Sequence, residues 1–165
     1  MTPLSVALTL WDIGLVSEAD LVAWADAQIL EQENPSDEFF EISLHGPAWC
    51  LKWEARELMT RPVQLTFLEE FSLRACALNL ASDPSATRFV DWASRFCMGE
   101  ELKQPEVSLG YHLDHLSADC GDMPAAIRLL REKLPALMPH CRSVATPFLA
   151  QVPGLSIRGT VDLSS

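Results

Sequence analysis

The sequence predicts an all-α protein, folded as a multi-helix bundle or as a short array of helical repeats. Two observations lead to this prediction. Apolar residues recur at helical spacing from residue 17 to about residue 138, and helix-capping and helix-breaking residues divide this region into segments. The chain has 165 residues, of which 48% are hydrophobic and 21% charged. It is long enough to bury a core, and its composition is that of a globular protein rather than a disordered or fibrous one.

The clearest helix is expected at residues 17–32. Ser17 is a favourable N-cap residue, and Glu18 and Asp20 place negative charge at the positive end of the helix. Pro35 follows the segment and ends it, because the residue before a proline avoids the helical conformation. The apolar face of this helix consists of Leu21, Val22, Ala25 and Ile29.

The N-terminal segment fits two patterns. Residues 4–10 alternate apolar and polar side chains as a strand does, whereas Leu4, Leu8 and Trp11 also share one face of a helix. We favour the helix, because Gly14 lies shortly before the Ser17 cap and makes a compact turn between two helices.

The rest of the chain is expected to form further helices. One at 37–44 is capped by Ser36, and others span about 47–60, 65–80, 83–99 and 105–118. The last begins at Pro124, and Pro135 and Pro139 are expected to limit its length. Residues 1–140 are therefore expected to form a single helical domain.

Residues 141–165 are expected to form an irregular or short-strand tail. Leu155, Ile157, Val161 and Leu163 alternate with polar residues around Gly159, which is a strand pattern. The tail either packs on the helices, pairs with the N-terminal segment if that segment is extended, or stays mobile.

A weak internal repeat divides the helical domain. Residues 17–26 and 85–94 share Ser, Val, Trp and Ala in the same register, and residues 41–44 resemble residues 106–109. A duplication would give halves at about 15–82 and 83–140 that stack as helical repeats do. Chance similarity between amphipathic helices is the alternative. The matching tryptophans, Trp24 and Trp92, are expected in the core.

Negative charge is concentrated in the N-terminal third. The net charge is -11, and residues 1–51 contain nine acidic residues and no Lys or Arg. Nucleic acid is a disfavoured partner, because binding it requires basic residues that neutralise phosphates. The acidic third is either a solvated face or a docking surface for a protein with a basic surface, whose encounter it would accelerate.

The candidate partner-binding residues lie in and after this acidic third. Paired carboxylates without a cleft motif do not predict a hydrolase, so we call no catalytic residue. Trp49 and Trp53 lie one helical turn apart, either in the core or as partly exposed anchors. The full candidate set is Glu31, Glu33, Asp37, Glu38, Glu41, Trp49 and Trp53.

A second group combines imidazole and thiol. His112 and His115 lie one helical turn apart, and Asp119 and Cys120 follow a turn later, which is ligand spacing for a metal. Structural zinc usually takes four ligands, and the sequence offers no second pair apart from His140-Cys141, whose adjacent side chains do not easily converge. We therefore predict no metal and no cofactor, and no signature joins these residues as an enzyme's base and nucleophile.

The sequence also indicates the cellular compartment in which the protein is expected. No segment approaches 18 consecutive apolar residues, and residues 3–11 lack a preceding basic region, so neither a membrane span nor a signal peptide is expected. Five scattered cysteines without a CxxC spacing are typical of reduced thiols. We expect a cytoplasmic protein without a membrane partner.

Residues 17–44 resemble small helical bacterial immunity proteins, which are encoded beside polymorphic or contact-delivered toxins. The similarity lies in the helical run 21–29, in Pro35 and in residues 41–44. It implies an inhibitor that occludes the active site of a toxin and has no catalysis of its own. The alternatives are a helical adaptor or secretion chaperone for a basic effector segment, and a metal protein or enzyme using His112, His115 and Cys120.

Overall fold

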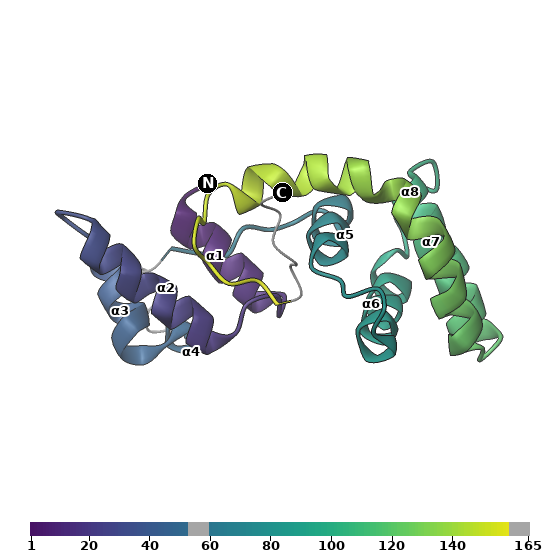
Figure 1. Ribbon diagram of the computed structural model, residues 1–165, viewed down its shortest axis with the longest axis horizontal. Helices are drawn as coiled ribbons and strands as arrows, with labels where there is room; N and C mark the ends of the chain where they lie inside the picture. Colours follow the sequence, from purple (N-terminus) through teal and green to yellow (C-terminus); the bar gives the residue numbers. More distant parts are fainter. Residues whose placement is uncertain (53–59, 159–165) are drawn as a thin grey trace. The chain divides into compact units, whose positions relative to one another are not determined.

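The computed structural model describes residues 1–52 and 60–158, and these residues confirm the all-α class. They form eight α-helices and one π-helical turn, and no strand occurs among them (Figure 1). The chain divides into two compact units. The first unit comprises residues 1–64 and 148–158, and the second is built from residues 65–147.

Four helices belong to the first unit: α1 (Pro3–Asp12), α2 (Glu18–Glu31), α3 (Asp37–His45) and α4 (Pro47–Cys50). The predicted caps are present. Ser17 Oγ accepts a hydrogen bond from the Asp20 amide at 3.0 Å, and Ser36 Oγ accepts one from the Glu38 amide at 3.4 Å. The helices expected near residues 4–10, 17–32 and 37–44 are therefore confirmed. Of the one expected at 47–60, residues 47–50 are helical and residues 53–59 lie outside the described residues.

The core of the first unit forms around α1 and the inner faces of α2 and α3. Every residue of α1 from Leu4 to Leu10 is buried. Trp24 of α2 is also buried, and its ring meets Phe39 of α3 edge-on, with 5.8 Å between the ring centroids. This burial confirms the expected core position of Trp24.

Residues 150–158 follow the last helix and pack within the first unit without forming a strand. The Trp24 indole donates a hydrogen bond to the Pro153 carbonyl at 3.1 Å, and the Arg158 amide donates one to the Leu15 carbonyl at 2.8 Å. The strand pattern expected around Gly159 is not found over residues 155–158, and its remaining positions, including Val161 and Leu163, lie outside the described residues.

The second unit contains α5 (Phe67–Cys76), α6 (Asp83–Phe96), α7 (Pro105–Asp114), the π-helical turn η2 (His115–Asp119) and most of α8 (Met123–Leu149). Its core is rich in aromatic side chains. The Trp92 ring stacks on Phe67 with 5.4 Å between centroids, and the Arg74 guanidinium lies 4.8 Å from the Trp92 ring centroid. Trp92 is 9% exposed, so its predicted core position is also confirmed.

Two of the expected boundaries in this unit are wrong. The helix expected to reach residue 80 ends at Cys76, and α8 does not end near Pro135 or Pro139 but continues to Leu149. Residues 141–149 are consequently helical rather than part of a tail. None of the helices in the described part of the chain, α8 included, combines the length and apolar character that a membrane span requires.

The apolar pattern of α8 explains why its prolines do not stop it. Pro135 and Pro139 are exposed, whereas the buried stripe of the helix continues through Leu134 to Cys141. Each proline removes one backbone hydrogen bond and bends the helix, but the buried stripe keeps the chain against the core. Figure 1 shows α8 changing direction partway along its length.

The repeated segments fall in different units. One lies on α2 and α3, which pack together, and the other on α6 and α7, which also pack together. The two copies differ at their starts, because Ser17 caps α2 whereas Ser85 lies inside α6. A duplication stays a hypothesis.

Candidate functional site

The outer face of α3 combines acidic and large apolar side chains. Asp37, Phe40, Glu41 and Leu44 recur at the spacing that places residues on one side of a helix. Phe40 is 41% exposed and Leu44 74% exposed, whereas Phe39 and Ile42 point into the core. We call Asp37, Phe40, Glu41 and Leu44 the α3 face.

Two further predicted acids lie at the end of α2. Glu31 and Glu33 are both exposed, and the neighbouring Leu30 is 86% exposed. Glu31 also lines a hollow of about 190 Å³ beside Trp24 and Pro153. The end of α2 thus repeats the composition of the α3 face, with carboxylates beside an exposed apolar side chain.

Glu38 differs from the other predicted acids because its carboxylate has internal partners. It is half-buried, and it accepts a hydrogen bond from the Thr60 amide and another, at 3.0 Å, from the Thr60 hydroxyl. These two bonds tie α3 to residue 60. Glu38 therefore has a structural role within the first unit.

Trp49 lies beside the α3 face. It is half-buried on α4, and its ring centroid lies 5.1 Å from that of His45. The His45 ring in turn lies 3.6 Å from the Glu41 carboxylate. Trp49 is thus connected to the α3 face through His45, whereas Trp53 lies outside the described residues.

The histidine and cysteine group is brought together only in part. His115 Nδ1 lies 3.1 Å from Asp119 Oδ2, and His115 Nε2 lies 3.7 Å from Cys120 Sγ. His112 lies instead on the wall of a groove between α7 and α8. No group of three or more His, Cys, Asp or Glu side chains within residues 1–52 and 60–158 is arranged to hold a metal ion.

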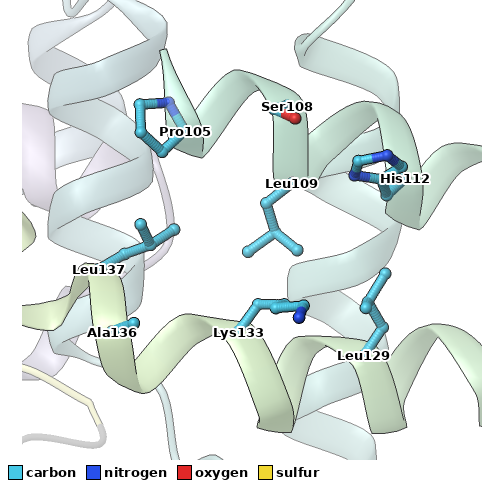
Figure 2. A pocket seen from close by; sticks show the side chains of 8 residues that line it. All are labelled: Pro105, Ser108, Leu109, His112, Leu129, Lys133, Ala136 and Leu137. Atoms are coloured by element: carbon cyan, nitrogen blue, oxygen red, sulfur yellow. The ribbon is translucent and has the colours of Figure 1, made fainter.

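The groove that His112 lines has a volume of about 300 Å³ and is mostly apolar. Figure 2 shows Leu109 of α7 and Leu129 of α8 pointing into the space between the two helices. Ser108, His112 and Lys133 contribute the polar side chains of its lining. The full lining is Pro105, Ser108, Leu109, His112, Leu129, Lys133, Ala136 and Leu137.

A contact between a buried carboxylate and an exposed imidazole links α7 to α8, and sequence reasoning missed it. Glu106 is 1% exposed, and its Oε1 lies 2.8 Å from His140 Nδ1. The neighbouring Cys141 is buried, and this burial raises the pKa of its thiol to about 11. In the sequence Glu106 has the position of an ordinary first-turn acid, and only the packing of α7 against α8 identifies its partner.

Comparison of the chain with protein families, with curated proteins and with solved structures finds no match. The resemblance of residues 17–44 to immunity proteins therefore stays a prediction. The strongest support for a binding role is the composition of the α3 face, because large apolar side chains are exposed there among carboxylates.

Proposed function

We propose that this chain is a non-catalytic binding protein that neutralises a cognate toxin by occluding its active site. The observation that carries the proposal is the α3 face, where Phe40 and Leu44 are exposed beside Asp37 and Glu41. Exposed apolar side chains surrounded by charge are typical of protein-binding surfaces. The partner is a protein whose basic surface meets these carboxylates.

The two kinds of side chain have different roles in this proposal. Asp37 and Glu41 attract the basic surface and speed the encounter, because charges at the rim of an interface act mainly on the association rate. Phe40 and Leu44 lose water on contact and slow dissociation, since buried apolar area stabilises the complex. The half-buried Trp49 is a candidate anchor at the edge of the same surface.

The proposal is tested by affinity capture from the cells in which the chain is made. Wild-type protein and a Phe40→Asp/Leu44→Asp variant serve as paired baits, and the expected result is a protein captured by the wild type alone. Phe96→Asp/Leu102→Asp is the control, because Phe96 and Leu102 are also exposed, 58% and 63% respectively, but lie in the second unit.

The captured protein is then tested for toxicity. If this chain is an immunity protein, the partner should arrest growth when it is expressed alone. Co-expression of this chain should abolish the toxicity, and addition of this chain should abolish the activity of the purified partner. A partner that stays fully active in the complex would instead support an adaptor or secretion chaperone. Equal capture by the wild type and the α3 variant would contradict the proposed surface.

A further inference from the structure

A thiol, an imidazole and a carboxylate meet at the end of η2, in an order that activates a sulfur nucleophile. Cys120 Sγ lies 3.7 Å from His115 Nε2, and Asp119 Oδ2 lies 3.1 Å from His115 Nδ1. A carboxylate bound to Nδ1–H leaves Nε2 free to accept a proton, and Nε2 faces the thiol. The three groups are exposed to solvent.

The π-helical turn produces this arrangement. In an α-helix, residues five positions apart are separated by about 140° around the axis, because one turn takes 3.6 residues. In a π-helix the backbone bond joins residues five apart, so both i+4 and i+5 return to the side of residue i. The Cys120 amide donates this bond to the His115 carbonyl at 3.0 Å, and Asp119 and Cys120 consequently flank the His115 ring.

Cys120 also differs from the other four cysteines. Cys50, Cys97 and Cys141 are buried and Cys76 is half-buried, and burial raises the pKa of each of these thiols. Cys120 is exposed and is the cysteine of the five that contacts an imidazole. A reagent in solution therefore meets Cys120 first, and a thiolate formed there has a base beside it.

We propose that Cys120 is a thiol–disulfide exchange site for small cationic disulfides, with His115 as its base and Asp119 as the residue that positions His115. The cationic class follows from charge, because Asp114, Asp119 and Asp122 are acidic and residues 112–125 contain no Lys or Arg. The site is independent of the α3 face, so either proposal can fail alone.

The exchange is balanced without an external oxidant. The proton of the Cys120 thiol passes to His115 Nε2, and the thiolate attacks one sulfur of the disulfide. The bond between the two disulfide sulfurs breaks as the bond to Cys120 Sγ forms. The departing thiolate then takes the proton from His115, so that one thiol and one disulfide become a mixed disulfide and a new thiol.

The test measures the second-order rate at which cystamine modifies the full chain at pH 7, with the modified cysteine located by peptide mass spectrometry. Cys120 is expected to react before the other cysteines. His115→Gln is expected to slow its modification by about 100-fold, which is the lower end of the range for a general base. Asp119→Asn is expected to slow it less. His112→Gln is the control. It is expected to leave the rate unchanged, because His112 lines the groove between α7 and α8 and does not contact Cys120.

Circular dichroism of each variant shows whether the helices are retained. An unchanged rate in a folded His115→Gln variant would overturn the role of the imidazole. Oxidised glutathione, which is an anion, is expected to react more slowly than cystamine at low salt. Equal rates for the two disulfides would overturn the cationic class.

Discussion

Trp24 and Trp92 look equivalent in the sequence but have different surroundings. The Trp24 indole donates a hydrogen bond to the Pro153 carbonyl, whereas the buried Trp92 Nε1 has no partner among the described residues. Replacement by Phe removes the N–H in both cases. We expect Trp24→Phe to lower the free energy of unfolding by about 1–3 kcal/mol more than Trp92→Phe does. Urea denaturation measures this difference. A larger loss of unfolding free energy for Trp92→Phe than for Trp24→Phe would show that the hydrogen bond at Trp24 contributes little.

Asp37 and Glu38 are adjacent acids with opposite roles. Glu38 accepts two hydrogen bonds from Thr60, and Asp37 is exposed in the first turn of α3. Glu38→Lys should therefore reduce the free energy of unfolding by about 2–3 kcal/mol, since hydrogen bonds to a charged group are lost. Asp37→Lys should reduce it by only about 0.3–1 kcal/mol through the helix dipole. Equal losses in thermal or urea denaturation would contradict the structural role of Glu38.

The sequence shows where the acidic residues are, but it does not show which of them are engaged within the protein and which can contact a partner. Asp37, Glu38 and Glu41 form one acidic group when read along the chain, and nothing local distinguishes them. The partner of Glu38 lies more than twenty residues away, at Thr60, so its role depends on how the chain folds back. The same reason hid the pairing of Glu106 with His140.

The packing of α6 against α7 depends on Gly110. A Cβ built at this position would lie 2.7 Å from Cys97 Cβ, which is closer than real side chains approach. Gly110→Ala is therefore expected to destabilise the protein by about 1–3 kcal/mol, although Ala favours helices more than Gly. Cys97→Gly should restore part of this loss in the double variant, whereas Cys97→Ala should not, because it keeps the Cβ. A Gly110→Ala protein as stable as the wild type would mean that α6 and α7 can shift apart to accommodate the methyl group at little cost in free energy.

Local signals predicted helix starts well and helix ends poorly. Caps at Ser17 and Ser36 depend on neighbouring residues only, and the structure confirms both. The continuation of α8 past Pro135 depends instead on the core that holds its buried stripe. The π-helical turn at residues 115–119 has no local signal that we recognise, and α-helical spacing wrongly grouped His112 with Cys120.

The division into two units also escapes local reasoning. Residues 148–158 belong to the first unit, although they follow the whole second unit in sequence. The contacts that place them there are the bonds from Trp24 to Pro153 and from Arg158 to Leu15. The helical spacing of apolar residues and the composition predict an all-α class, but they do not predict which distant segments pack together.

The uneven charge of the chain leads to the central claim, that the α3 face captures a basic protein. Reversal of Asp37 and Glu41 removes the two carboxylates of this face, the first exposed and the second partly exposed, and leaves the Glu38–Thr60 contact intact. The matched control is Glu100→Lys/Glu101→Lys, which changes the net charge equally at two exposed residues of the second unit. The two variants therefore separate the local effect of the α3 face from the effect of total charge.

The decisive measurement is the association rate constant of the captured partner with the wild type, Asp37→Lys/Glu41→Lys and the control, at low and at high salt. We expect the α3 variant to associate about tenfold more slowly than the control at low salt, since electrostatic steering accounts for at least that factor. The difference should shrink at high salt, because exposed charges are screened. Equal association rates for the two variants at low salt would show that the α3 face is an ordinary solvated surface, and would contradict the account.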